Sequence, residues 1–301
     1  MKRRAFRRTL AALGLGLALG SGALSAAAQE GVTWRQVPPE NLVFIGMREG
    51  EIVLELNPTF APQTVARFRQ KVRDGFFRGM SFYRVIEGFV AQAGPGGDIP
   101  VDEEDFLPAE FQLSRGDELP WVTVQRDAFF APETGFIDGF PAARDDRHVW
   151  LTHCPGAVAV ARGNEPDSGA RDFYIVIGQA PRYLDRNLTV FARVIDGMEV
   201  AQRIQRGPTE NNGIIDNDLA RSRISRMRLA DQLEPEERRD FYVMDTTSRG
   251  FRAMMEERRD RDHAFFVNKP PAILDVCQVP VATRVEKAGA LLRRPDGTES
   301  N

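Results

Sequence analysis

From residue 51 to residue 229 the chain alternates short runs of β-branched and aromatic residues with turns of Gly, Pro, Asn and Asp. Runs of this kind are typical of β-strands. Six are predicted as strands: Glu51–Leu56, Phe82–Ala91, Gly156–Ala161, Phe173–Ile177, Thr189–Ile195 and Ile224–Leu229. Two helices are predicted between them, from Pro62 to a cap at Gly75 and over Met198–Gln205. Many short strands with few helices favour an antiparallel barrel or sandwich over a doubly wound α/β sheet.

Two segments exceed what a minimal barrel needs. An insertion of about residues 95–155 is rich in aromatic residues, which predicts that it packs on another part of the protein. A charged C-terminal extension follows from residue 231 to residue 301. Phe251, Met254 and Met255 have the spacing of an amphipathic helix in this extension, which Lys269-Pro270-Pro271 is expected to break. The sequence therefore predicts a barrel domain over residues 29–230 and an extension whose last residues, about ten, are disordered.

The first 28 residues have the composition of an export signal. Five basic residues among the first eight precede an apolar run from Leu10 to Gly20 and the small residues Ala26-Ala27-Ala28. The run is too short for a membrane anchor, which needs roughly 20 apolar residues. Cleavage after Ala28 and a periplasmic location are predicted. Arg3-Arg4 resembles a twin-arginine signal, and a general secretory signal is the alternative.

Charge and cysteine content limit the partners. Removal of the first 28 residues changes the formal net charge from −3 to −8, so nucleic acid is not an expected partner. The chain has 2 Cys, Cys154 and Cys277. In an oxidising compartment they either form one disulfide or remain two buried thiols, and the sequence leaves both alternatives open.

Three motifs follow one another in the barrel sequence. The first is Phe82-Tyr83-Arg84-Val85-Ile86-Glu87-Gly88-Phe89-Val90-Ala91-Gln92, and the second runs from Ala161-Arg162 through Asp167-Ser168 to Asp172-Phe173-Tyr174-Ile175. The third combines Tyr183-Leu184-Asp185 with Val190-Phe191-Ala192-Arg193-Val194 and Gly197-Met198. In this order and spacing they resemble the F-H-R-V-I-x-G-F-x-x-Q-G, A-R-x-x-x-x-D-S-A-x-S-Q-F-F-I and W-L-D…V-F-G-x-V-x-x-G-M segments of cyclophilin-type peptidyl-prolyl isomerases.

The resemblance covers about residues 51–229 and implies a fold and an activity. The fold is a closed eight-stranded antiparallel barrel with a helix over each end. The activity is rotation about X-Pro peptide bonds in folding proteins, without cofactor, metal or ATP. Proline-containing polypeptides are the implied substrates. The second hypothesis is a peptide-binding or chaperone module with little turnover. In it the barrel is kept, but the insertion and the charged extension either cover the groove or recruit a partner.

The resemblance also implies site residues. Arg84 matches the catalytic arginine, Gln92 the glutamine that helps to hold it and Phe89 the adjoining pocket residue. Matching substrate-binding positions are Val90, Ala161, Asp172, Tyr174, Tyr183, Leu184 and Leu188.

Several of these positions depart from the usual pattern. Val90 replaces methionine, Asp172 glutamine and Leu188 histidine. Tyr174 replaces phenylalanine and brings into an apolar pocket a hydroxyl that needs a hydrogen-bond partner. The departures predict a working but slower enzyme. A zinc site at His148, His153 and Cys154 is a remote third hypothesis, because the usual ligand spacings are missing.

Overall fold

The computed structural model describes residues 31–97, 101–116 and 118–287. The predicted signal of residues 1–28 and the last residues of the extension lie outside the described residues. The strands are β1 (Trp34–Gln36), β2 (Leu42–Met47), β3 (Gly50–Leu56), β4 (Ser81–Val85), β5 (Val90–Gly94), β6 (Leu113–Ser114), β7 (Trp121–Ala128), β8 (Ala131–Ile137), β9 (Phe140–Arg144), β10 (His148–Leu151), β11 (Ala157–Val160), β12 (Phe173–Val176), β13 (Val190–Asp196), β14 (Ser222–Leu229), β15 (Arg239–Met244) and β16 (Thr283–Lys287). The α-helices are α2 (Pro62–Arg73), α3 (Met198–Ala201) and α4 (Arg249–Asp260).

Eight strands close into an antiparallel barrel, which confirms the predicted fold. Their order around the barrel is β11-β12-β5-β4-β14-β2-β3-β13. Alternate residues of each strand point inward, so Ala91 and Ala93 of β5 and Phe173 and Ile175 of β12 are buried in the barrel core. The residues between them point outward and are available for a binding surface.

One of the two predicted barrel helices is shorter than expected. Helix α2 begins at Pro62 as predicted and buries Val65, Phe68 and Val72 against the barrel core. Helix α3 ends at Ala201, before the predicted end at Gln205. The backbone N–H groups of Arg203 and Ile204 bond carbonyls only three residues back, so the α-helical pattern is lost after the first turn.

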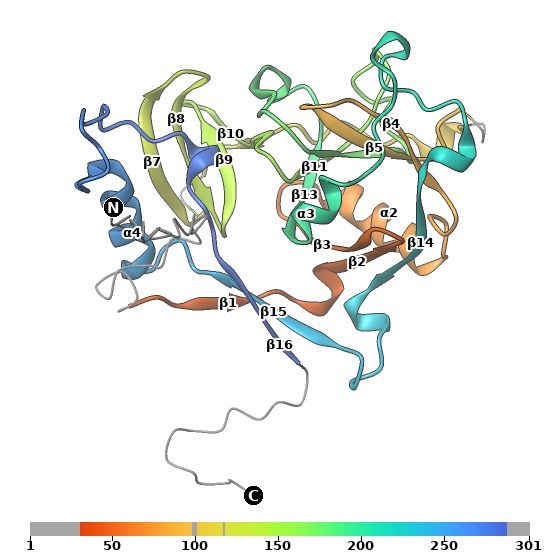
Figure 1. Cartoon of the computed structure of the whole chain (residues 1–301), viewed down its shortest axis with the longest axis horizontal. Helices are drawn as coiled ribbons and strands as arrows, with labels where there is room; N and C mark the ends of the chain where they lie inside the picture. The colour runs from red at the N-terminus through yellow and green to blue at the C-terminus, as the bar shows by residue number, and fades with distance from the viewer. Residues whose placement is uncertain (1–30, 98–100, 117, 288–301) are drawn as a thin grey trace, which may run out of the picture.

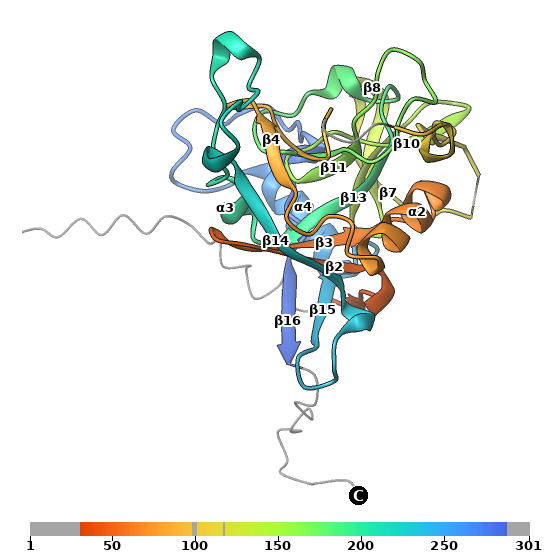
Figure 2. The ribbon, with the colours of Figure 1, turned by 90° about the vertical axis from the view of Figure 1, so that its right-hand side faces the viewer.

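The segments outside the barrel fold together. The insertion forms a five-stranded sheet in the order β6-β10-β9-β8-β7, and β1, β15 and β16 form a three-stranded sheet. We call these eight strands and α4 the accessory module. It stands beside the barrel in Figure 1, and Figures 1 and 2 both show β15 and β16 below β2 and β3. The ring of Phe251 on α4 packs edge-on against Phe136 of β8, with centroids 5.4 Å apart, in a core separate from that of the barrel.

The predicted helix of the extension ends earlier than expected. Helix α4 begins after Ser248, whose hydroxyl accepts the N–H of Phe251 at 3.2 Å, and ends before Arg261 in a left-handed conformation. Lys269-Pro270-Pro271 therefore lies beyond the helix and does not break it, because the left-handed residue has already ended the helical hydrogen bonding.

Two kinds of contact join the barrel to the accessory module. Buried Glu55 of β3 accepts from Arg35 at 2.5 Å and from Arg193 at 2.8 Å, and Arg193 also donates to the carbonyl of Gly139. Apolar residues of β8–β10 pack on the outer face of β11 and β12. Within the core of the accessory module, a disulfide joins Cys154 of the insertion to Cys277 of the extension. Among the described residues, none of the helices has the length and hydropathy to cross a bilayer.

Candidate active site

Arg84 and Gln92 lie opposite each other on paired strands. They are register partners in β4 and β5, and the Nη1 of Arg84 donates to the Oε1 of Gln92 at 3.1 Å. The Nε of Arg84 donates to the carbonyl of Asn212 at 3.1 Å, and its Nη2 to the Asn212 Oδ1 at 3.4 Å. A guanidinium has five N–H donors, so these three bonds fix the group in place and leave two donors for a ligand.

A chain of polar contacts continues from Gln92. The Nε2 of Gln92 donates to the hydroxyl of Tyr83, and that hydroxyl also bonds the carboxylate of Asp172. Burial, followed by the Asp172 charge, raises the pKa of Tyr83 far above its ordinary value, so the hydroxyl stays protonated and donates. Burial also raises the pKa of Asp172, whose Oδ1 accepts the N–H of Gly96 at 2.8 Å. Asp172 thus supports the Arg84 end of the site through Tyr83 and Gln92.

Gly94 is required for this arrangement. Its φ of +138° disfavours any other residue, and a Cβ there would lie 2.5 Å from the Oδ1 of Asp172. The close approach brings the loop after β5 onto the Asp172 side chain.

Apolar side chains lie next to Gln92, whose register partner on β12 is Tyr174. We call Phe89, Val90, Ala161, Tyr174, Leu184 and Leu188 the proline seat. All but Leu184 belong to one apolar cluster with residues of β8–β10. Val90 and Tyr174 are only 2% and 4% exposed, whereas Phe89, Ala161, Leu184 and Leu188 are half-buried. Tyr183, also predicted as a substrate contact, is 68% exposed at the rim.

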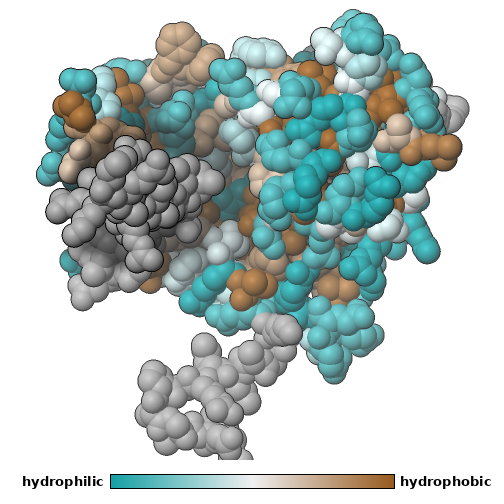
Figure 3. Space-filling view, in the orientation of Figure 1, coloured by the Kyte–Doolittle hydropathy of each residue, from teal (hydrophilic) through white to brown (hydrophobic). Residues whose placement is uncertain are grey.

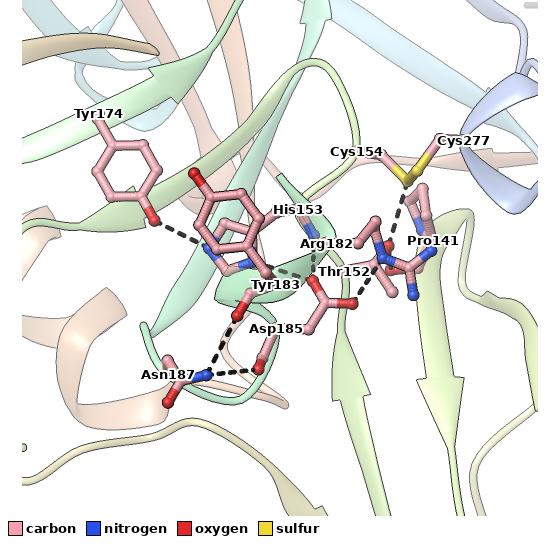
Figure 4. Close-up of polar contacts among 10 residues, drawn as sticks. All are labelled: Pro141, Thr152, His153, Cys154, Tyr174, Arg182, Tyr183, Asp185, Asn187 and Cys277. Atoms are coloured by element: carbon pink, nitrogen blue, oxygen red, sulfur yellow. Dashed lines mark hydrogen bonds and ion pairs between the residues drawn. A yellow bond between two sulfur atoms is a disulfide. The ribbon is translucent and has the colours of Figure 1, made fainter. Parts of the chain in front are cut away.

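The hydroxyl of Tyr174 forms a hydrogen bond with His153 of the insertion (Figure 4). It lies 2.8 Å from the Nε2 of fully buried His153, whose Nδ1 lies 3.1 Å from the Oδ1 of Asp185. The Oδ2 of Asp185 accepts from the Nε of Arg182 at 2.6 Å. Burial, followed by the Asp185 charge, raises the pKa of Tyr174, so Tyr174 donates to Nε2 and the Nδ1–H of His153 donates to Asp185. The hydroxyl is therefore turned away from the seat.

Two residues of the site were not predicted as functional. Asn212 precedes Gly213 in a turn, and the chain beside it pairs with β4 through the bond from Val85 N–H to Gly213 O at 2.8 Å. The Asn-Asn-Gly sequence signals that turn but not its contact with Arg84. The second is His153, which the sequence indicated only as a ligand of the hypothetical zinc site. In the structure its ring nitrogens bond Tyr174 and Asp185, and Cys154 is in the disulfide, so neither is available to zinc.

The site combines one fixed cation with an apolar cluster. Within the part of the chain that the structure describes, no group of three or more His, Cys, Asp or Glu side chains is arranged to hold a metal ion. A guanidinium with two free donors can stabilise a developing lone pair, and an apolar seat can hold a ring while its neighbours rotate.

Comparison with known proteins identifies the family of the chain. Residues 42–228 match the family model described as cyclophilin type peptidyl-prolyl cis-trans isomerase/CLD. The "Probable peptidyl-prolyl cis-trans isomerase" of Brucella suis is 31% identical over 183 residues, which are 60% of this chain and 79% of the relative. The "Peptidyl-prolyl cis-trans isomerase CYP23" of Arabidopsis thaliana is 29% identical over 168 residues, 55% of this chain and 60% of the relative.

A solved structure is similar over a longer range. The crystal structure of cyclophilin AquaCyp293 from Hirschia baltica has a TM-score of 0.70 and 27% identity, covering 85% of this chain and 94% of the other. The similarity thus extends beyond the residues that the family model matches. Since that model spans more than half of the 301 residues, the chain belongs to the cyclophilin-type peptidyl-prolyl cis-trans isomerase family.

Proposed function

We propose that this protein catalyses cis-trans isomerisation of X-Pro bonds in polypeptides that fold after export, with Arg84 as the catalytic cation. The observation that carries the proposal is the Arg84 guanidinium, held by Gln92 and Asn212 beside the proline seat with two donors free.

The mechanism follows from the electronic structure of the amide. Rotation about the X-Pro bond has a barrier of ~18–20 kcal/mol, because the planar bond loses its resonance when twisted. The prolyl nitrogen of the twisted bond becomes pyramidal and regains a lone pair. A donor from Arg84 bonds that lone pair, which neither planar isomer offers, so it stabilises the transition state selectively. The proline ring rests on Phe89 and its neighbours while the preceding residue rotates, and no covalent intermediate is formed.

The test is a protease-coupled assay with a proline tetrapeptide. Arg84→Ala is expected to lower kcat/KM about a hundredfold, the usual loss for one donor to a developing charge. Arg84→Lys keeps the charge but loses the planar fork that two partners hold, so only partial activity is expected. Arg78→Ala, at an exposed arginine shortly before β4, is the matched control and should be unchanged. Wild-type protein that fails to exceed the spontaneous rate would refute the proposal.

A second candidate function is a peptide-binding module with weak turnover. The near-complete burial of Val90 and Tyr174 favours it, because little of the seat's floor is left for a proline ring. The same variants separate the two functions. Equal peptide affinity of wild type and Arg84→Ala, without acceleration by either, would support the module.

The export part of the proposal rests on the sequence of residues 1–28 and on the disulfide. Disulfides persist in oxidising compartments, so the Cys154–Cys277 bond supports a periplasmic location. Cell fractionation should find the mature protein in the periplasm with Gln29 as its first residue. Arg3→Lys with Arg4→Lys should block export if the twin-arginine route is used and should leave export unchanged if the general secretory route is used.

A further inference from the structure

The hairpin between β7 and β8 ends in two exposed aromatic residues. Ala128 pairs with Ala131, so Phe129 and Phe130 form the whole connection, and we call them the hairpin tip. Phe129 is 94% exposed and Phe130 is 48% exposed. Their rings contact each other edge-on, with centroids 4.9 Å apart. Figure 3 shows an apolar projection at this end of the accessory module.

The fold does not account for these two residues. Two-residue hairpin turns favour Gly, Asn and Asp, because those residues tolerate the required backbone angles and water. Neither Phe129 nor Phe130 belongs to a core cluster of the described residues. Two large apolar side chains in solvent mark a binding surface more often than a structural one.

The hairpin tip contacts Arg182, which lies two residues before Leu184 of the proline seat in the chain. The guanidinium of buried Arg182 lies over the Phe130 ring, 5.4 Å from its centroid. Arg182 begins the 3₁₀ helix Arg182–Leu184, so the next two residues are Tyr183 at the rim and Leu184 of the seat. Successive Cα atoms are ~3.8 Å apart, so Leu184 lies within about two residues of extended chain from Arg182. The tip therefore lies within reach of an extended polypeptide whose proline is on the seat.

The size of the surface indicates the kind of partner. An aromatic side chain buries ~150–250 Å² at most, so the two tip residues offer less than the ~800 Å² per partner of a stable protein interface. That area suits one or two apolar side chains of an extended peptide and is too small to hold a second folded copy of the chain.

We propose that Phe129 and Phe130, with Tyr183, form an accessory subsite for an apolar side chain that flanks the isomerised proline in an extended polypeptide. The proposal rests on the proposed function, since the proline bound at the seat brings that side chain to the tip. It gives the enzyme a preference for proline near apolar residues, which unfolded chains expose and folded proteins bury.

The experiment compares Phe129→Ser with wild type. Phe129 is almost fully exposed and belongs to no core cluster of the described residues, so its replacement removes the contact with Phe130 and leaves the cores unchanged. Leu219→Ser is the matched control, because Leu219 is 90% exposed in the loop before β14. The substrates are a proline tetrapeptide and twelve-residue peptides with one proline and either Phe or Ser placed two to five positions from it on either side. Isomerisation is followed by NMR exchange and affinity by fluorescence anisotropy.

Wild type should prefer one or more of the Phe peptides over the matching Ser peptides. Phe129→Ser should lower kcat/KM for those Phe peptides roughly three- to tenfold, the effect of one aromatic contact, and leave the tetrapeptide and the Ser peptides unchanged. Phe129→Trp should restore the preference. An equal loss on every substrate, no loss on any, or the same loss in Leu219→Ser would overturn the proposal.

Two further outcomes are distinguishable. If wild type does not turn over the tetrapeptide, the proposed function fails, and the affinities of the Phe and Ser peptides then decide the subsite by the same comparison. If sedimentation shows that wild type is a dimer and Phe129→Ser a monomer, the tip is a contact between copies and the subsite proposal is wrong.

Discussion

Removal of the Tyr174 hydroxyl tests whether His153 supports the floor of the proline seat. In Tyr174→Phe the bond of 2.8 Å to the Nε2 of His153 is lost. His153 is fully buried, and its Nδ1 is already committed to Asp185, so Nε2 is left without a partner. A net hydrogen bond contributes ~0.5–1.5 kcal/mol, and an unsatisfied buried acceptor costs ~1–3 kcal/mol. We expect a loss of about 1–2 kcal/mol in the free energy of unfolding.

The family motif alone would predict the opposite result for Tyr174→Phe. Phenylalanine is usual at this position in the family, so a hydroxyl without a specific partner would make Tyr174→Phe neutral or stabilising. Tyr183→Phe is the matched control, because that side chain is 68% exposed and its hydroxyl bonds none of the described residues, so the free energy of unfolding should change by less than about 0.5 kcal/mol. Urea unfolding with the disulfide intact measures both variants.

A double-mutant cycle with His153→Phe isolates the pair. Tyr174→Phe and His153→Phe should show a coupling free energy of about 1 kcal/mol in the double variant, because removing the second partner relieves the unsatisfied group. Additivity within about 0.3 kcal/mol would refute the hydrogen bond as a stabilising contact.

Four other perturbations have defined outcomes. Gly94→Ala should lower the free energy of unfolding by roughly 1–3 kcal/mol and displace the Asp172 side chain. Gly97→Ala is the control, because a Cβ there meets open space, and thermal unfolding compares the two variants. Glu55→Gln removes the ion-pair partner of Arg35 and Arg193 and should lower the free energy of unfolding by about 3–5 kcal/mol in urea, and a neutral result would show that the buried ion pairs are dispensable. Replacing both Cys154 and Cys277 by Ser should cost about 2–5 kcal/mol, because the bond closes a loop with a sequence separation of 123. Burial raises the pKa of Asp172, so its negative charge opposes folding above that pKa, and this cost in the free energy of unfolding disappears as the pH falls through it. Asp172→Asn should therefore be more stable than wild type at pH 7, and the difference should shrink by pH 4. A difference that grows towards pH 4 would contradict the raised pKa.

The sequence predicted the barrel better than the accessory module. Most barrel strands have one face inside and turns at both ends, which local patterns indicate. β2 was not among the predicted strands, because all six of its residues are buried and the run Leu42–Met47 shows no alternation. Phe44 on its outer face packs on Phe241 of β15, about two hundred residues later, and no local pattern reports such a contact. The insertion was predicted to pack, but its sheet depends on α4, which lies in a distant part of the chain.

The site residues likewise fall into those that the motifs indicated and those that only the structure shows. Motif resemblance located Arg84 and Gln92, and their strand pairing brings them together as expected. Asn212 lies 128 residues from Arg84, and His153 lies in the insertion, where the motifs give no guidance. Residues that position others were therefore missed, since their role is defined only by tertiary contacts.

The connectivity of the accessory module sets an order of events during synthesis. All eight barrel strands lie between residues 42 and 229, whereas β1 near the N-terminus pairs with β15 and Cys154 bonds a cysteine 123 positions later. At about 5–20 residues per second a ribosome needs roughly 6–25 s to add that stretch. A nascent or truncated chain that stops near residue 230 holds every barrel strand, yet it leaves Phe136 and the outer face of β2 without their cover. Such a product would expose apolar surface that proteases and chaperones recognise, so synthesis of residues 231–287 decides whether an otherwise finished barrel survives.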